Sequence, residues 1–477
     1  MAVARESTTE AASSGERMRP REGRVPLGVV LAYGTPILGL SAQLFFVQFF
    51  FLKFATDVLL IAPATVGLIF ALGRVWDAVS DPIVGTWSDR TRTRLGRRRP
   101  WMLAAIPLLG IAFAVVWIPP QSLTGASLTA WVAVGLFGFY AGYTAYGIPH
   151  TSLGAELTTD HHERSRIFGV RHASFMLGVM LAFAGMQFVE NSEDPRSAAA
   201  AVALAGIAGM SIVLLVPPVF VRERHEHQGR GAESSFRAMS DVLRNPHARL
   251  LLVVTFVDIA GSSVLGIISP YLIVYVLKRP DLIGPLPAAF FASSVLSIPL
   301  WIRASQRFGK RNVWVVALIG LAISFGACFF IGEGDVAPLI ALLILGGVSA
   351  GCGGAIGLSM LADTIDYDEF VSRERKEGAY SAAQGFATKA ANATIILVSG
   401  VTLQLSGFVP NAEQTPSARM AISGLFAGVP FVMFLVGAGL LSRFRLDHRE
   451  HARIRIELDR RHQNDRGRNG NLEEGSA

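Results

Sequence analysis

Charged residues and cysteines are scarce in this chain. Of its 477 residues, only 17% are charged, whereas 51% are hydrophobic. A soluble protein of this length would need several domains with many charged surface positions, so the composition excludes that class. The two cysteines, Cys328 and Cys352, form no CxxC motif, which excludes a disulfide framework and a cysteine-based metal site. We interpret them as small buried apolar side chains.

Long apolar runs dominate the sequence instead. A helix of about 20 apolar residues crosses the ~30 Å hydrocarbon core of a bilayer, and the chain contains about twelve such runs. All of them must be helical, because lipid offers no partner for backbone polar groups. We therefore predict an all-α integral membrane protein. The predicted spans are 27–54, 60–88, 101–119, 128–152, 166–190, 197–220, 248–277, 283–303, 312–332, 336–362, 378–406 and 418–442.

Arginines mark one side of the predicted membrane. The basic run DRTRTRLGRRRP follows the second span, whereas PPQSLTGAS and GEGDVAP, on the opposite side, contain no lysine or arginine. Lys53 is one of a few scattered exceptions. The positive-inside rule then puts both termini in the cytoplasm, and we expect a monomeric multi-pass protein of the cell inner membrane. The net charge of +7 reflects this topology and binding to the lipid bilayer, not to nucleic acid.

The chain divides into two halves of six spans, an architecture typical of secondary transporters. We assign residues 27–220 to the first half and 248–442 to the second, joined by a cytoplasmic linker at 221–247 with a short amphipathic helix. SDRTRTRLGRRRPW after the second span is echoed by SQRFGKRNVW after the eighth, which indicates duplication. Residues 1–26 are a polar, disordered tail without the apolar core of a signal peptide. Residues 443–477 are a basic tail, expected to lie against anionic lipid.

Two aspartates lie deep inside the second predicted span. Asp77 and Asp81 are one helical turn apart, so both carboxylates lie on the same face. At ~1.5 Å per residue they are ~18 and ~12 Å from the cytoplasmic boundary, where ionisable groups are costly and indicate function. Two adjacent carboxylates cannot both stay ionised without a counter-charge, so they must share a proton or bind a cation. Na⁺ fits a site of several oxygen ligands.

Two basic residues are candidate partners of this pair. Arg74, three residues before Asp77, is able to form a structural ion pair with it, which is the alternative to a cation site. Lys389 is the only charge in the middle of the eleventh span and has the same estimated depth as Asp77, ~18 Å. A lysine there must face the bundle interior and meet either the aspartates or a substrate group. Asp258, in the seventh span, is compatible with a substrate or proton site and with a hydrogen-bonded structural role.

These segments resemble a known transporter family. GRVWDAVSDPIVGTWSDRTRTRLGRRRPW, followed by LADTIDYDEF and KEGAYSAAQGFATKAANA, is similar to the melibiose permease-like glycoside-pentoside-hexuronide:cation symporters of the major facilitator superfamily. The resemblance covers nearly all of the membrane part in the same order. It also extends to eukaryotic sodium-dependent lysolipid transporters, which share the aspartate motif.

The resemblance implies roles for individual residues. The cation site is expected at Asp77, Asp81 and Thr144, with Na⁺ or H⁺ as coupling ion and no other cofactor. The substrate-cavity residues that it implies are Tyr143, Arg171, Gln384 and Lys389. Asp258, Ser41 and Gln48 are added as further candidates from their positions in the predicted spans. A cytoplasmic gate is expected at Arg90, Asp363, Asp366, Glu369, Arg375 and Glu377, for most of which a solvated loop is the alternative. No cluster of nucleophile, base and oxyanion groups indicates an enzyme.

The likeness to the permease has gaps in the substrate cavity. Its two sugar-anchoring acids and its stacking tryptophan correspond here to Ser41, Gly147 and Thr151. Buried sugar hydroxyls need paired acceptors, which argues against a galactoside. We therefore expect symport of a small organic solute, with a sugar or glycoside first and a lysolipid as the alternative. Proton-driven efflux is a third alternative, although the fifth span lacks the Gly-Pro-rich motif of such antiporters. The aromatic run LFFVQFFFLKF of the first span is expected to face lipid, with the lining of an apolar cavity as the alternative.

Overall fold

The structure is a computed structural model that describes residues 25–157, 161–220, 242–374, 376–444, 446, 450–451, 453–458 and 460–461; for 155, 156, 161, 162, 164, 165 and 377 it describes the backbone alone. The regular elements in these ranges are helices. They are α1 (Leu27–Gly34), α2 (Pro36–Phe45), the π-helix η1 (Phe46–Phe50), α3 (Phe51–Asp57), α4 (Pro63–Arg90), α5 (Arg99–Trp117), α6 (Gly125–Glu156), α7 (His161–Glu190), α8 (Pro195–Phe220), α10 (Pro246–Tyr271), the π-helix η3 (Leu272–Val276), the 3₁₀ helix η4 (Pro280–Leu282), α11 (Pro285–Phe308), α12 (Lys310–Ala327), the 3₁₀ helix η5 (Cys328–Phe330), α13 (Val336–Ser372), α14 (Glu377–Leu405), α15 (Pro416–Ser423), the π-helix η6 (Gly424–Gly428) and α16 (Val429–Leu441).

Most of these helices are built to cross a membrane. Eleven helical segments of the described residues are long and apolar enough to do so. α4 is not among them, because Arg74, Asp77 and Asp81 lower its hydropathy. It is nevertheless 28 residues long and runs between the first span and α5, so it crosses the bundle with the others. The predicted all-α membrane fold is confirmed.

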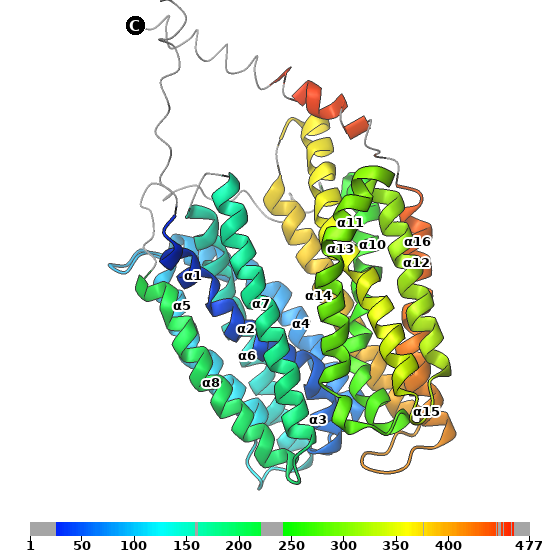
Figure 1. Cartoon of the computed structure of the whole chain (residues 1–477). Coiled ribbons are helices and arrows are strands. Elements are labelled where there is room, and N and C mark those ends of the chain that lie inside the picture. The colour runs from blue at the N-terminus through cyan, green and yellow to red at the C-terminus, as the bar shows by residue number, and fades with distance from the viewer. Residues whose placement is uncertain are drawn as a thin grey trace, which may run out of the picture.

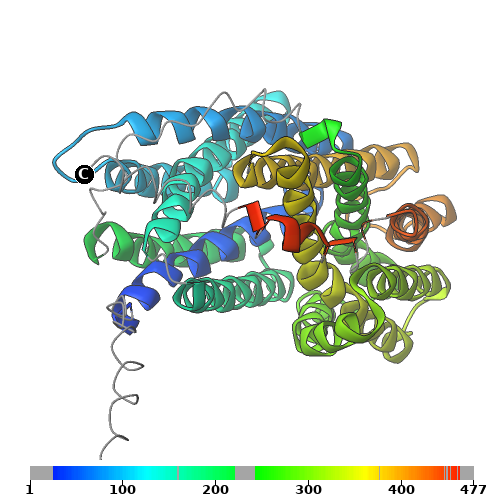
Figure 2. The same ribbon diagram turned by 90° about the horizontal axis from the view of Figure 1, so that it is seen from above.

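The two halves stand side by side and meet most closely at one end. Figure 1 shows α1–α8 as one bundle and α10–α16 as the other. The start of α1 and the described helical residues between 450 and 461 (450–451, 453–458 and 460–461) lie at one end, here called the tail end. α3 and α15 lie at the opposite end, the far end. Figure 2, viewed from the tail end, shows residues 450–461 above the second half.

Glycines bring the halves together towards the far end. A Cβ on Gly400 of α14 would lie 2.3 Å from the carbonyl oxygen of Pro63 in α4. A Cβ on Gly266 of α10 would lie 2.1 Å from the ring of Phe49 in η1. Backbones approach this closely only where the side chain is a hydrogen atom. The far end is therefore the closed end of the interface between the halves.

The aromatic run of the first span (Leu27–Asp57) points into the protein. Phe46, Phe50 and Phe54 surround Trp117 of α5, with ring centroids 4.2, 6.2 and 4.9 Å from the tryptophan. All four side chains are buried. The expectation that this run faces lipid is wrong, because the first span packs against α4, α7, α8 and α10 at once.

The tail end departs from the sequence expectations in two ways. α13 continues to Ser372, ten residues beyond the predicted span. The helical residues 450–461 pack on this extension, where Ile454 and Leu458 are buried and the guanidinium of Arg461 lies 4.7 Å from the ring centre of Phe370. One side of this segment thus faces α13, whereas Ile456 is exposed, and the contact of its basic residues with anionic lipid stays a prediction. Most of the tail and linker regions expected at 1–26, 221–247 and 443–477 lies outside the described residues.

The close contact at Gly400 leads to a stability prediction. We expect Gly400→Ala to force α4 and α14 apart and to destabilise the protein by about 1–3 kcal/mol, the usual cost of overpacking. Gly378→Ala, on the same helix but with open space at its Cβ position, is the matched control and should not destabilise. The melting temperatures of the purified variants in detergent measure the difference. Equal melting temperatures would contradict the close packing.

Candidate cation and substrate site

Asp77 and Asp81 lie on the face of α4 that is turned towards the second half. They are spaced by one helical turn, so both carboxylates reach the same region. Asp77 has only 4% of its side chain exposed and Asp81 has 29%. Asp81 is the nearer of the two to the tail end, since α4 runs from the far end to the tail end. Exposure of the site therefore increases towards the tail end.

Thr144 of α6 binds both aspartates. Its hydroxyl oxygen lies 2.8 Å from Asp77 Oδ1 and 2.9 Å from Asp81 Oδ1. Gly73 makes this approach of α6 and α4 feasible, because a Cβ there would lie 2.9 Å from the ring of Tyr140, one turn before Thr144. A hydroxyl carries one hydrogen and two acceptor lone pairs. Thr144 therefore has one proton to donate and retains lone pairs that are suited to a cation.

Lys389 of α14 joins the two halves at this site. Its Nζ lies 3.0 Å from Asp77 Oδ2 and also contacts Asp81 Oδ2. Each carboxylate thus turns one oxygen to Thr144 and the other to the ammonium. Lys389 and Asp77 were expected at equal depth. In the structure they lie on the facing helices α14 and α4 and are in direct contact.

Arg74 is a second positive neighbour. Its Nη1 lies 3.4 Å from Asp77 Oδ2, and its guanidinium lies 4.6 Å from the ring centre of Tyr140. Arg74 contacts only one of the two acids, so it does not replace Lys389 as the partner of the pair. Two carboxylates, one ammonium and one guanidinium have a formal charge sum of zero. Electrical neutrality lowers the cost of burying these groups together.

Three further candidates for the substrate site are on α6, α7 and α14. Tyr143 of α6 lies within electrostatic range of Asp77, Asp81 and Arg171. Arg171 of α7 is half-buried, and its Nε has no hydrogen-bond partner among the described residues. Gln384 of α14 is also half-buried.

The remaining cavity candidates have other surroundings. Ser41 is 1% exposed, and its hydroxyl lies within donating distance of the carbonyl oxygens of Ile37 and Phe175. Since Phe175 is on α7, Ser41 helps to pack α2 against α7. Gln48 is bound to Arg74 and to Asn392 of α14 and is therefore a link between the halves. Asp258 lies within the second half, where its carboxylate faces Gly353 of α13.

Three of the expected gate charges, Asp363, Asp366 and Glu369, lie together on α13. Asp363 pairs with Lys310 of α12 at 2.6 Å, and Asp366 lies 3.1 Å from His451 and 3.5 Å from Arg455. Glu369 is buried on the same extension of α13, and Arg90 is exposed at the end of α4. Arg375 and the side chain of Glu377 lie outside the described residues. The described contacts of Asp363 and Asp366 thus brace the tail end of the second half and do not bridge to the first.

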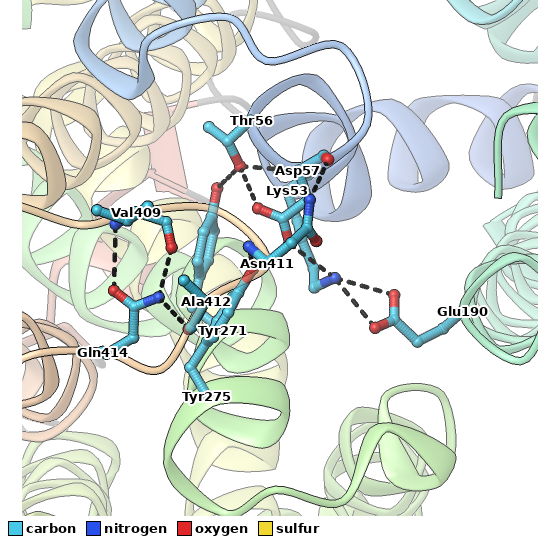
Figure 3. A network of polar contacts seen from close by, with 10 residues as sticks. All are labelled: Lys53, Thr56, Asp57, Glu190, Tyr271, Tyr275, Val409, Asn411, Ala412 and Gln414. Carbon is cyan, nitrogen blue, oxygen red and sulfur yellow. Dashed lines mark hydrogen bonds and ion pairs between the residues drawn. The ribbon is translucent and has the colours of Figure 1, made fainter.

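A polar network closes the far end (Figure 3). The hydroxyls of Thr56 and Tyr271 lie 2.8 Å apart, Tyr275 donates to Asp57 Oδ2 at 2.7 Å, and Asn411 donates to the Asp57 carbonyl at 2.7 Å. Each of these three bonds connects the two halves. They form what we call the far-end seam.

A buried ammonium supports the seam from the first half. Lys53 lies 3.0 Å from both Asp57 and Glu190. In the sequence analysis Lys53 was only an exception to the positive-inside rule. A signal was present nonetheless, since Lys53 falls inside a predicted span, where a charge needs a partner. The contacts of Asn392 and Ser263 carry no comparable sequence signal, because single polar side chains are common in spans.

Comparisons with known proteins agree with this architecture. Residues 32–448 match the family described as MFS/sugar transport protein. An isoprimeverose transporter of Lactiplantibacillus pentosus is 24% identical over 456 residues, covering 92% of each chain. A mouse protein named sphingosine-1-phosphate transporter MFSD2B is 27% identical over 460 residues, covering 88% of this chain and 90% of its own. The crystal structure of a D-xylose-proton symporter has the same fold, with a TM-score of 0.64 at 13% identity over 88% of this chain and 97% of its own. The chain therefore belongs to the MFS/sugar transport protein family and is a multi-pass membrane transporter, as its likeness to the glycoside-pentoside-hexuronide:cation symporters implied.

Proposed function

We propose that this chain is a symporter that couples a monovalent cation to a small organic solute by alternating access. The observation that carries the proposal is the position of Lys389 between Asp77 and Asp81. The one positive charge that contacts both acids belongs to the opposite half. A cation that enters must compete with this ammonium, and its binding breaks the ion pair between the halves. Ligand binding and a change in the arrangement of the halves are linked in this way.

The basic loops favour the tail end as the cytoplasmic side of the cell inner membrane. In that orientation the far-end seam seals the outside, while the site is approached from inside. The greater exposure of Asp81 and Lys389 than of Asp77 agrees with an inward-facing arrangement.

The oxygen donors favour Na⁺ as the coupling ion. Two carboxylates and the Thr144 hydroxyl supply several hard ligands at one place. A proton, which needs only one of the carboxylates, is the alternative. Either ion would free Lys389 to meet a substrate group.

A sugar or glycoside is the substrate class that the cavity side chains favour. Among the described residues Arg171 Nε has no hydrogen-bond partner, and Tyr143 lies within electrostatic range of Arg171 and of both aspartates. Gln384 is a half-buried amide on the helix that carries Lys389. Such groups suit a solute with several oxygen atoms. The isoprimeverose transporter among the relatives agrees with this class.

A lipid-like substrate is the second candidate, on a different observation. Phe45 of α2 lies 5.5 Å from Phe175 of α7 and 6.2 Å from Phe291 of α11 in the other half, measured between ring centroids. All three rings are only partly buried. An apolar wall of this kind suits an acyl chain, and one relative is named a sphingosine-1-phosphate transporter.

Substitution of Lys389 tests whether its ammonium competes with the cation for the two aspartates. In Lys389→Met the cation no longer has to displace a charge, so we expect Na⁺ or protons to bind about tenfold more tightly, which corresponds to ~1.4 kcal/mol. Cation-driven uptake should nevertheless be lost, because the link between the halves is gone. Calorimetric Na⁺ titrations at several pH values measure the affinity, and vesicle uptake measures the coupling. Weaker cation binding in the variant would show that Lys389 does not compete.

Substitution of Thr144 tests whether its hydroxyl is a ligand of the cation. Thr144→Val keeps the shape and removes the hydroxyl, and we expect the cation concentration for half-maximal uptake to rise about tenfold, the effect of one lost contact of ~1.4 kcal/mol. Thr394→Val, which removes an exposed hydroxyl bonded only to its own helix, is the control and should have no effect. Asp77→Asn should abolish cation stimulation altogether. Stimulated uptake that survives Asp77→Asn would rule out this site.

Substrate class is tested by counterflow in proteoliposomes with neutral glycosides, anionic glycosides and lysophospholipids, each with Na⁺ and with a proton gradient. We expect exchange of a glycoside, and a loss of at least tenfold in Arg171→Gln, because a buried donor that meets the solute is lost. Exchange of lysophospholipids alone would replace the sugar class with the lipid class.

A further inference from the structure

A chain of buried polar side chains runs from the aspartates to the opposite half. Arg74 donates through Nη1 to Asp77 Oδ2 at 3.4 Å and through Nη2 to Gln48 Oε1 at 3.2 Å. Gln48 Nε2 donates to Asn392 Oδ1 at 2.9 Å, and the Ser263 hydroxyl lies 2.6 Å from the same oxygen. The chain therefore starts on α4 and η1 of the first half and ends on α14 and α10 of the second.

Burial makes these bonds sensitive to any rearrangement. Arg74, Gln48 and Asn392 are 7%, 9% and 8% exposed. Gln48 uses both ends of its amide, with the oxygen accepting from Arg74 and the nitrogen donating to Asn392. A buried polar group that loses its partner is costly, so the bonds on the two sides of Gln48 depend on each other.

The chain lies between the cation site and the far-end seam. On α4, Arg74 is almost one turn nearer the far end than Asp77. On α14, which runs the opposite way, Asn392 is almost one turn nearer the far end than Lys389. Gln48 lies in the π-helix η1, a local irregularity often found at functional sites. The same first span reaches the seam at Thr56 and Asp57.

We propose that Gln48 and Asn392 form a coupling bridge that holds the far end closed while Arg74 is bound between Asp77 and Gln48. The inference rests on the proposed cation symport. A monovalent cation that binds at Asp77 takes up the carboxylate that also holds Arg74, and so weakens the hold of Asp77 on Arg74. As Arg74 moves, Gln48 loses its partner and the interface loses its innermost link on the far-end side. Gln48 and Asn392 are positioning residues here, since they act through Arg74 and do not ligate the cation.

Distances across the far end test the bridge. Spin labels at Ser122→Cys and Phe330→Cys mark exposed far-end positions, one in each half. Cys328→Ala and Cys352→Ala remove the native thiols, both of which are buried. Double electron–electron resonance in lipid nanodiscs then reports closed and open far ends, with Na⁺ and acid pH as separate arms. We expect one of these cations to increase the open population of the otherwise unsubstituted protein.

Gln48→Leu should open the far end without any cation. We expect the open-to-closed ratio in cation-free buffer to rise about fivefold, equivalent to ~1 kcal/mol, and the response to the cation to shrink. Asn392→Leu should act in the same way. Na⁺ affinity, measured by calorimetry, should stay within about threefold of the unsubstituted protein, a change of less than ~1 kcal/mol.

Two matched variants separate a bridge from a general packing effect. Gln48→Asn combined with Asn392→Gln keeps the summed length of the two side chains and should restore the cation-free closed population. Gln43→Leu changes another buried amide of the first span, one without a hydrogen-bond partner among the described residues. It should leave the distances unchanged.

The outcomes distinguish the bridge from the symport on which it rests. A folded Gln48→Leu protein with unchanged distances overturns the bridge, and so does a loss of Na⁺ binding as complete as in Asp77→Asn, because Gln48 would then belong to the cation site. Failure of the exchanged pair to restore closure also overturns it. If the otherwise unsubstituted protein responds to neither Na⁺ nor protons, the proposed symport itself is overturned.

Discussion

The contact of Lys389 with Asp77 and Asp81 is the interaction on which the rest of this structure depends. Together with Arg74, Lys389 balances two acids that would otherwise be too costly to bury, and it does so with a charge from the opposite half. The same contact therefore stabilises the site and holds the two halves in one arrangement. Any ligand that takes the place of the ammonium changes both at once, which is the physical basis for coupling in a transporter of this kind.

Further contacts between the halves continue from the cation site to the far end along the first span. Gln48, Thr56 and Asp57 each bond to the second half, and Phe49 fits against Gly266. The first span is 72% buried over its most apolar stretch, and its aromatic side chains pack on Trp117 of its own half. The first span therefore connects Gln48, beside the cation site, with Thr56 and Asp57 at the far-end seam.

Much of the fold and of the cation site could be predicted from particular residues. Apolar runs determine the spans, because lipid accepts only helices or closed barrels, and α4 was recognisable as a span despite its charges. The spacing of Asp77 and Asp81 determines that both lie on one face. Helix boundaries were least predictable at α13, because its extension to Ser372 depends on contacts with Lys310 and with residues 450–461 that the local sequence does not reveal.

The sequence by itself determined the membrane class, the two halves, the depth of the buried charges and the resemblance to a transporter family. Periodicity, composition and spacing along one helix are enough for these. The resemblance already grouped Thr144 with the two acids. Tertiary structure alone decided that Gln48 faces Arg74 and Asn392, that Ser41 is used in packing and that Lys53 supports the closed end. These features join residues far apart in the chain. Which side chains come into contact depends on the rotation of each helix about its own axis, and this rotation is set only when the helices pack together.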